Sequence, residues 1–268
     1  MDRVMVLARG LGTRMRKTDA AAKLDTAQAA IAESGVKALI PIDRPFLDYV
    51  LTVVADAGYR RVCLVIGPEH EELRNYYAAT TTSRLQISFA VQQEPLGTAD
   101  AVIAAESFAG GEPFLMINSD NHYPREALQG LRQAGGPAVA VFDEDAMLAG
   151  SNIPAERLCK FAVVETDAAG RLRRIIEKPD PETLARLPKP RGVSMNCWRF
   201  GPAIFEACRS IGPSPRGELE IPDAVQYSID HLGERYEVVQ CNAPVLDLSS
   251  RADVAPVAAL LAGKEVKL

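Results

Sequence analysis

Short apolar runs alternate with amphipathic segments along the first half of the chain. The runs have the length of buried strands, and the segments between them place apolar residues on one face of a helix. The predicted strands are Val4–Ala8, Val62–Ile66, Leu85–Val91 and Phe114–Ile117, and the predicted helices are Pro45–Ala57, Glu69–Tyr77 and Thr98–Glu106. This alternation predicts an α/β protein with a doubly wound, mostly parallel sheet. Ligands of such sheets bind beyond the carboxyl ends of the strands, so the loops after Ala8, Val91 and Ile117 are the expected positions of a site.

The second half of the chain has a less regular pattern, which predicts an α+β lobe. Its predicted strands are Ala138–Phe142, Val193–Phe200, Glu237–Cys241 and Pro244–Leu246, with a hairpin over Phe161–Ile176 and helices over Pro202–Arg209, Pro222–His231 and Arg251–Leu261. No repeat or flexible linker separates the halves. We therefore predict one domain over residues 1–268, with one lobe over about 1–120, a second over about 121–247 and a C-terminal helix over about 248–268.

The composition is that of an ordinary globular protein. Of 268 residues, 47% are hydrophobic and 24% are charged, which excludes collagen-like and disordered classes. The 30 Lys and Arg against 35 Asp and Glu leave a net charge of −5, which argues against nucleic-acid and membrane partners. Residues 1–37 depart from this average, because their seven basic and four acidic residues leave a local charge of +3. A patch of that size suits a triphosphate.

The sequence points to a cytoplasmic protein with reduced thiols. The apolar run Val4–Ala8 is too short for a signal-peptide core, and no run has the length of a membrane-spanning helix. The cysteines are scattered singly and are odd in number, so a complete disulfide framework is not expected. They are Cys63, Cys159, Cys197, Cys208 and Cys241.

A glycine-rich segment, Gly10-Leu11-Gly12-Thr13-Arg14-Met15, directly follows the first predicted strand. Glycines let backbone N–H groups approach an anion, and the Arg14 guanidinium suits a phosphate. A dinucleotide-binding fingerprint would need glycine in place of Met15, and a P-loop would need a later Gly-Lys-Ser/Thr. Taken alone, the segment fits a phosphate loop and a plain strand-to-helix turn equally well.

Six segments in order carry a resemblance to a known family. They are Gly10–Met15, Lys37–Ile42 followed by Arg44-Pro45, Gln92–Ala99, Asn118–Asn121, Glu177–Pro179 and Gly217–Asp223. With them the chain resembles the sugar-1-phosphate nucleotidyltransferases, which include glucose-1-phosphate thymidylyltransferase. The resemblance implies the nucleotide-diphospho-sugar transferase fold, with a Rossmann-like sheet and an α+β sugar-binding lobe. It also implies an enzyme that uses Mg²⁺ to join a sugar-1-phosphate to a nucleoside triphosphate, giving a nucleotide-sugar and pyrophosphate.

The resemblance further implies roles for individual residues. Arg14 would hold the β- and γ-phosphates, Lys37 the α-phosphate and Lys178 the phosphate of the sugar. These three and Asp120 form the implied catalytic set. The implied nucleotide-binding residues are Ala8, Gly10, Gly12, Thr13, Arg14, Gln92, Gly97 and Thr98. The implied sugar-phosphate-binding residues are Glu177, Lys178, Asn196 and Glu218.

Two aspartates are candidates for the metal. Asp120 and Asp247 each follow a short apolar run, and Mg²⁺ prefers carboxylates together with substrate phosphates. Each aspartate has an alternative function as a helix cap. In the resembling family the matching aspartates share the ion, and on that basis we expect both to bind metal.

Several positions leave alternatives open. Gln93 competes with Gln92 for the base, and Arg9, where the family has a small residue, either contacts the nucleotide or points to solvent. The interval between Arg14 and Lys37 is longer than in familiar members. Its Ala-rich segment, Thr18–Gly35, predicts a helical lid and introduces Lys23 as a rival to Lys37.

Residues 161–162 and 197–200, near the sugar motifs, depart from the family pattern. They leave open whether the sugar substrate is glucose-1-phosphate. Two other functions remain open. One is a cytidylyltransferase acting on a phosphorylated alcohol such as phosphocholine, and the other is a catalytically silent sensor of nucleotide-sugars. The base, the sugar and the formation of a homo-oligomer are not determined by the sequence.

Overall fold

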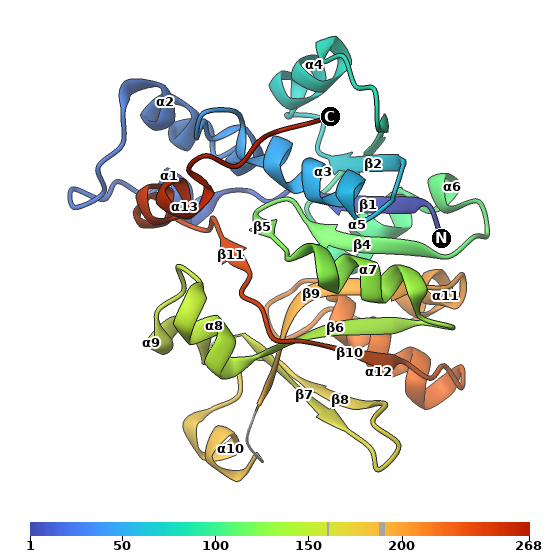
Figure 1. Cartoon of the computed structure of the whole chain (residues 1–268). Helices are drawn as coiled ribbons and strands as arrows, with labels where there is room; N and C mark the ends of the chain where they lie inside the picture. The colour runs from blue at the N-terminus through green and yellow to red at the C-terminus, as the bar shows by residue number, and fades with distance from the viewer. Residues whose placement is uncertain (160, 188–190) are drawn as a thin grey trace.

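A computed structural model describes residues 1–159, 161–187 and 191–268 of the chain (Figure 1). Within these residues the main sheet follows the order β10-β6-β9-β4-β1-β2-β3. Its strands are β1 (Arg3–Leu7), β2 (Arg61–Ile66), β3 (Gln86–Val91), β4 (Phe114–Asn118), β6 (Ala138–Asp143), β9 (Gly192–Phe200) and β10 (Glu237–Cys241). Along this order all strands run in one direction except β9, which is antiparallel to both β4 and β6. The predicted mostly parallel sheet is confirmed.

The register brings the carboxyl ends of the central strands together. Leu7 at the end of β1 pairs with Val65 on one side and with Asn118 on the other. The loops that begin at Ala8 and Ser119 therefore start at the same edge of the sheet. This is the edge at which an open parallel sheet binds its ligands.

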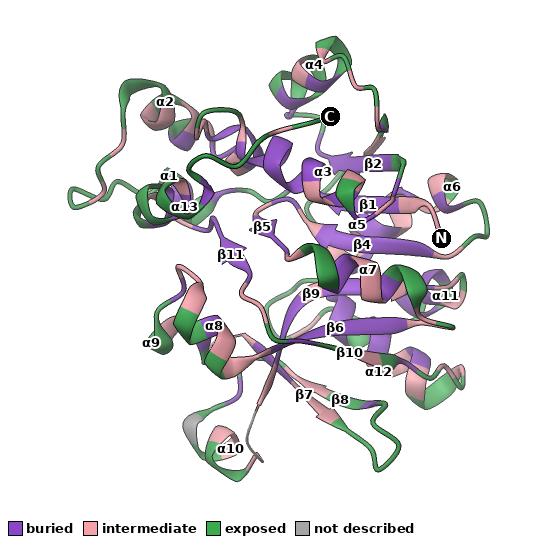
Figure 2. Cartoon of the chain, in the orientation of Figure 1, coloured by how far each residue is buried: buried purple, intermediate pink, exposed green. Residues whose placement is uncertain are grey.

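Helices cover both faces of the sheet, because alternate side chains of the central strands are apolar on both sides. In β1, Val4 and Val6 belong to one buried cluster, and Met5 and Leu7 belong to the other. The first cluster includes α3 (Phe46–Asp56), α4 (Glu71–Ala79), α7 (Arg125–Gln133) and α13 (Val254–Leu261), and the second includes α5 (Thr98–Ala104), α11 (Ala203–Ser210) and α12 (Ile221–His231). Figure 2 shows the buried strands between helices whose outer faces are exposed.

Smaller elements complete the second half. The predicted hairpin is present as β7 (Ala162–Thr166) and β8 (Leu172–Ile176), and β7 also pairs with β9. A separate two-stranded sheet joins β5 (Asn121–His122) to β11 (Leu246–Asp247). The remaining elements are α1 (Thr13–Arg16), α2 (Thr26–Ser34), η1 (Lys37–Leu39), α6 (Glu106–Ala109), α8 (Glu144–Gly150), α9 (Ala155–Leu158), α10 (Pro181–Arg186) and η2 (Arg251–Asp253).

The predicted helix over Thr18–Gly35 was too long. Asp19 accepts the amide of Ala21 in a local turn, and Asp25 caps a helix that begins only at Thr26. Side-chain oxygens that satisfy nearby amides favour turns and helix starts over helix interiors. The helix does end at Gly35, which has a left-handed backbone with φ of 78°.

Other boundaries also differ from the pattern. The predicted helix Thr98–Glu106 is divided into α5 and α6, and α7 to α10 were not predicted. Two of these short helices begin at aspartate caps, since Asp143 accepts the amide of Ala146 and Asp180 that of Thr183. Across the part of the chain that the structure describes, every helix is too short or too polar to cross a bilayer.

Candidate active site

The glycine-rich segment leaves β1 at the carboxyl edge of the sheet. The amide of Ala8 donates to Val65 O at 2.8 Å, so this residue still belongs to the strand framework. Gly12 has a φ of 61°, and a Cβ placed on it would lie 2.6 Å from Gly35 Cα. The close approach of α1 to the end of α2 therefore requires glycine here. Within the described residues, the amides of Gly10, Leu11 and Gly12 have no hydrogen-bond partner, which leaves donors for an anion.

Lys37 brings a positive charge to this loop. It begins η1, and its Cε lies next to Gly10, 3.9 Å from the position of a Cβ there. Its ammonium forms an ion pair with Asp120, which lies two residues after the end of β4. Both side chains of the pair are largely buried, with 14% and 20% of their surfaces exposed. Lys23, the rival predicted from sequence, is exposed in the loop before α2.

Asp247 lies beside Asp120 because β5 and β11 pair antiparallel. Asp247 is opposite Asn121 in that pair, and the amide of Leu248 donates to the carbonyl of Asp120 at 2.8 Å. The Asp247 carboxylate is buried. Its Oδ1 accepts hydrogen bonds from Asn121 at 2.9 Å and from Ser249 at 3.1 Å.

Burial and, to a smaller extent, the negative charge of Asp120 together raise the pKa of Asp247 to about 6, against the opposing charge of Arg157. Two carboxylates with this mutual effect form a site of concentrated negative charge, which a divalent cation would relieve. No cluster of three or more His, Cys, Asp or Glu side chains suited to a metal occurs in the described ranges. Two carboxylates completed by substrate oxygens nevertheless fit Mg²⁺, which seldom uses an all-protein cage.

A pocket of about 320 Å³ borders the glycine-rich loop. It is lined by Leu7, Arg9, Gly10, Leu11, Thr13, Gln92, Pro95, Gly97, Thr98, Ala101 and Glu218. Gln92 is buried and donates its amide to Gly97 O at 2.9 Å and to Asp100 Oδ2 at 2.8 Å. Gln93 is exposed and is not among the lining residues.

Arg9 does not point to solvent, because only 8% of its surface is exposed. Its guanidinium donates to the backbone carbonyl of Gln93 at 3.1 Å and approaches Glu69 at 3.5 Å. The arginine therefore ties the loop after β1 to the loop after β3.

The Gln92–Ala99 and Gly217–Asp223 motifs meet at this pocket. The amide of Leu219 donates to Leu96 O at 2.7 Å, and the amide of Ile221 donates to the Thr98 hydroxyl at 2.9 Å. Gly97 and Thr98 therefore have structural contacts within the protein. Glu218, which was expected on the sugar side, lines the pocket that holds Gln92.

Two of the four expected sugar-side residues have an unusual backbone. Lys178 and Asn196 are the non-glycine residues with positive φ among those described, at 42° and 53°. Asn196 lies where the pairing of β9 with β6 is interrupted by a bulge, a feature that redirects side chains beside active sites. Partial desolvation of the carboxylate raises the pKa of Glu177, and the nearby negative charge of Glu220 contributes to the increase. Trp198, by contrast, is fully buried and stacks on Phe200.

The two remaining predicted cations are exposed. Arg14 lies on α1 and Lys178 follows β8, and neither side chain makes a hydrogen bond or ion pair with the described residues. Sequence reasoning missed two residues that contact Asp247, namely Asn152 and Arg157. They belong to none of the six motifs, so no local signal marked them.

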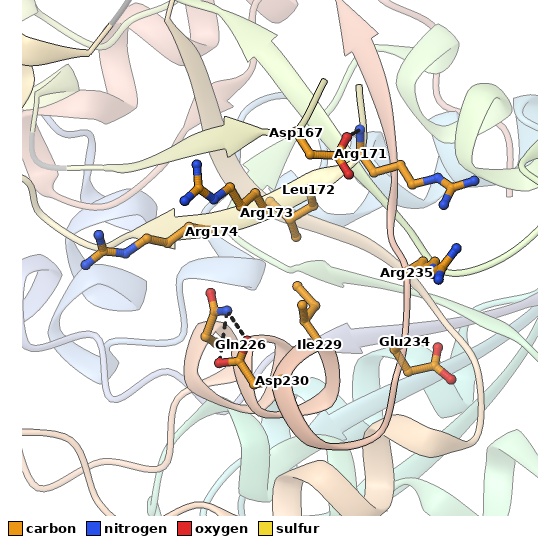
Figure 3. A pocket seen from close by; sticks show the side chains of 10 residues that line it. All are labelled: Asp167, Arg171, Leu172, Arg173, Arg174, Gln226, Ile229, Asp230, Glu234 and Arg235. Atoms are coloured by element: carbon orange, nitrogen blue, oxygen red, sulfur yellow. Dashed lines mark hydrogen bonds between the residues drawn. The ribbon is translucent and has the colours of Figure 1, made fainter. Parts of the chain in front are cut away.

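A second pocket, of about 760 Å³, lies between β8 and α12 and holds none of the predicted site residues. Figure 3 shows its arginines at opposite ends, with Arg173 and Arg174 on one side and Arg171 and Arg235 on the other. They do not converge on a common point. The chemistry-bearing residues therefore gather at the carboxyl edge of the sheet and not here.

Comparisons with known proteins agree with this geometry. The family description of nucleotidyl transferases matches residues 31–245. The low-salt glycan biosynthesis nucleotidyltransferase Agl11 of Haloferax volcanii is 28% identical over 261 residues, covering 91% of this chain and 66% of that protein. A glucose-1-phosphate thymidylyltransferase of Streptomyces griseus is 32% identical over 231 residues, covering 85% of this chain and 57% of that protein. The chain thus spans less than two thirds of the length of both relatives.

A solved structure of a UDP-glucose pyrophosphorylase complexed with UDP-glucose superposes with a TM-score of 0.76. It covers 99% of this chain and 100% of its own, at 20% sequence identity. This likeness confirms the predicted fold. The match of the nucleotidyl transferase family over residues 31–245, more than half of the chain, shows that the chain belongs to the nucleotidyl transferase family.

Proposed function

We propose that this chain is a Mg²⁺-dependent nucleotidyltransferase that joins a sugar-1-phosphate to a nucleoside triphosphate. One observation carries the proposal: the unpaired loop amides, Lys37, Asp120 and Asp247 meet at one end of the parallel strands. The activity named for the Streptomyces griseus relative supports the same substrate classes. In this proposal the lobe over about 1–120 binds the nucleotide, the lobe over about 121–247 binds the sugar phosphate, and the helix over about 248–268 completes the domain. The enzyme is cytoplasmic.

Two polyanions meet in this reaction, so the protein has to supply positive charge and fixed positions. A phosphate oxygen of the sugar-1-phosphate attacks the α-phosphorus. The bond from that phosphorus to the bridging oxygen breaks, and pyrophosphate leaves with the electron pair. The loop amides and Arg14 hold the departing β- and γ-phosphates, Lys37 holds the α-phosphate, and Lys178 holds the phosphate of the sugar.

Mg²⁺ at Asp120 and Asp247 would neutralise part of the triphosphate charge. The chain itself has to hold the carboxylates of Asp120 and Asp247 close together. The hydrogen bonds from Asn121 and Ser249 to Asp247 fix the position of the second carboxylate. Lys37 has a second role, because its charge offsets that of Asp120 before substrates bind. When a triphosphate arrives, Lys37 is already beside the glycine-rich loop.

The pocket lined by Gln92 suits the base. The amide nitrogen of Gln92 is engaged by Gly97 and Asp100, so its carbonyl oxygen is the group left to accept a hydrogen bond from a base. Arg9 closes the pocket beside it. Glu177 and Asn196 are assigned to the sugar hydroxyls, and Glu218 to the rim between the two substrates.

The experiment is to measure pyrophosphate release from the protein, Mg²⁺, each nucleoside triphosphate and a panel of sugar-1-phosphates. We expect release with at least one pair, and that pair identifies the base and the sugar. Release only with CTP and phosphocholine would favour the phosphorylated-alcohol reaction instead. No release with any pair, while a nucleotide-sugar still binds, would favour the sensor.

Variants test the assigned roles. Asp120→Asn and Asp247→Asn should each abolish release, whereas Asp145→Asn, on the exposed surface of α8, should not. Near-normal turnover of the first two variants would refute the metal assignment. Arg14→Ala should mainly raise the KM for the triphosphate and Lys178→Ala that for the sugar phosphate, and the reverse result would exchange their roles.

A further inference from the structure

The segment around α9 contacts Asp247 at its backbone. Asn152 Nδ2 donates to Asp247 O at 2.8 Å, and the amide of Asp247 donates back to Asn152 Oδ1 at 2.9 Å. One side-chain amide thus pairs with both backbone polar groups of Asp247. The contact joins residues that are 95 positions apart in the sequence. It fixes the point from which the Asp247 carboxylate extends.

The same segment contacts the carboxylate of Asp247 through Arg157. Its guanidinium lies 3.1 Å from Asp247 Oδ2 and 2.6 Å from Asp253 Oδ1. Asp253 is itself held, since its Oδ2 accepts the amides of Ser249 at 3.1 Å and Ser250 at 2.7 Å. Asp247 and Asp253 are both buried, with 3% of each residue exposed. Arg157 therefore bridges two carboxylates whose positions are set by the surrounding backbone.

Counting lone pairs indicates which oxygen of Asp247 remains available. An ionised carboxylate oxygen has two acceptor sites. Oδ1 uses both, for Asn121 and Ser249. Within the described residues Oδ2 accepts only from Arg157, so it retains one lone pair. A hydrogen bond from a fixed donor sets the direction of that remaining lone pair.

We propose that Arg157 is a positioning residue that holds Asp247 ready for a divalent cation. Asp253 fixes the guanidinium, and Asn152 fixes the Asp247 backbone. The inference rests on the proposed function, because it takes Asp247 as a metal ligand. Arginine suits the task since its planar group presents separate nitrogens to two carboxylates, whereas the single ammonium of lysine cannot reproduce that geometry.

The test is a titration of the protein with Mn²⁺ alone. Binding is measured as the decrease of the free-Mn²⁺ signal in electron paramagnetic resonance. The variant Arg157→Met should raise the Kd for Mn²⁺ about 10–100-fold, the usual effect of losing a partner of a metal ligand. Arg157→Lys, which keeps the charge, should give a smaller rise. Asp247→Asn, which removes a proposed metal ligand, shows the complete loss of Mn²⁺ binding for comparison.

The matched control is Arg191→Met. Arg191 forms an ion pair with Glu144 at 3.1 Å, and its side chain is 14% exposed against 21% for Arg157. It contacts neither candidate metal ligand. Its loss should leave the Kd for Mn²⁺ unchanged, which separates positioning from a general effect of removing a partly buried arginine.

A second readout separates metal binding from chemistry. In Arg157→Met, the Mg²⁺ concentration for half-maximal pyrophosphate release should rise about 10–100-fold, while kcat at saturating Mg²⁺ should recover most of its value. Unchanged or tighter Mn²⁺ binding would overturn the inference, because tighter binding would make Arg157 a competitor of the metal. If Arg157→Met does not fold, Arg157→Lys and Asn152→Ala decide, and unchanged affinity in both overturns it.

The proposed function and the positioning role of Arg157 can be refuted separately. An unaltered protein that binds Mn²⁺ with no pyrophosphate release from any substrate pair would refute the reaction, while the effect of Arg157→Met on Mn²⁺ affinity would still support the positioning role. An unaltered protein that binds no Mn²⁺ would refute both.

Discussion

Replacing Gly97 by alanine should destabilise the protein, because this position requires a glycine for two independent reasons. Its backbone has φ of 123° and ψ of −178°, a region that is almost confined to glycine. In addition, an alanine Cβ would lie 2.7 Å from the nitrogen and 2.9 Å from the carbonyl carbon of Leu219. Favourable contacts between such atoms begin near 3.5 Å. The backbone of one segment has to move.

The size of the loss follows from what that movement disturbs. The unfavourable φ and ψ cost about 1–3 kcal/mol. Three hydrogen bonds join the segments, from Leu219 to Leu96 at 2.7 Å, from Ala99 to Leu219 at 2.9 Å and from Ile221 to Thr98 at 2.9 Å. Losing one or two adds about 1 kcal/mol each. The expected decrease in the free energy of unfolding is therefore about 2–5 kcal/mol.

Equilibrium unfolding in urea measures this change, with the fluorescence of the single tryptophan, the buried Trp198, as the probe. The control is Gly212→Ala, where no heavy atom lies within 4 Å of the added Cβ and stability should change by less than about 0.5 kcal/mol. Equal stability of the Gly97→Ala and Gly212→Ala proteins would refute the reasoning. Because Gln92 donates to Gly97 O, the KM for the triphosphate should also rise in Gly97→Ala.

Three other predictions concern stability, pH and thiol reactivity. Asp48→Ala should lower the free energy of unfolding by about 2–4 kcal/mol, since the buried Tyr77 hydroxyl loses its acceptor at 2.8 Å. Tyr76→Phe should cost only about 1 kcal/mol, because Asp48 Oδ2 keeps its contact with Arg44 at 3.0 Å; equal losses in urea would contradict this. Burial lowers the pKa of His70 below 6.5, and its Nδ1 accepts the amide of Gly67. The unfolded chain therefore binds the proton more readily than the folded protein does, and the free energy of unfolding measured in urea should decrease as the pH falls below 6.5. The decrease should be smaller in His70→Gln than in the unaltered protein. A thiol reagent should modify the exposed Cys159 before the four buried cysteines, and a fast reaction in Cys159→Ser would contradict that.

Local patterns in the sequence determined the sheet and the edge at which the site lies. The apolar runs matched β1, β2, β3 and β4 to within a residue or two. The reason is clearest for β1, β2 and β4, since a strand that is buried on both faces has to be apolar nearly throughout. Parallel strands then bring the loops after Leu7 and Asn118 together. Asp120 and the glycine-rich segment could be placed at that edge without a structure. The motifs in order supplied the chemistry by resemblance.

The tertiary structure decided which side chains actually meet. It placed Lys37 beside Asp120 and left Lys23 exposed, although both lysines follow the same loop. It also moved Glu218 to the pocket of Gln92, and it brought Arg157 to Asp247 from 90 residues away. Such contacts depend on how distant segments pack, and no local periodicity, cap or turn encodes them. Periodicity therefore determines where strands end, whereas packing determines which partners each functional side chain finds there.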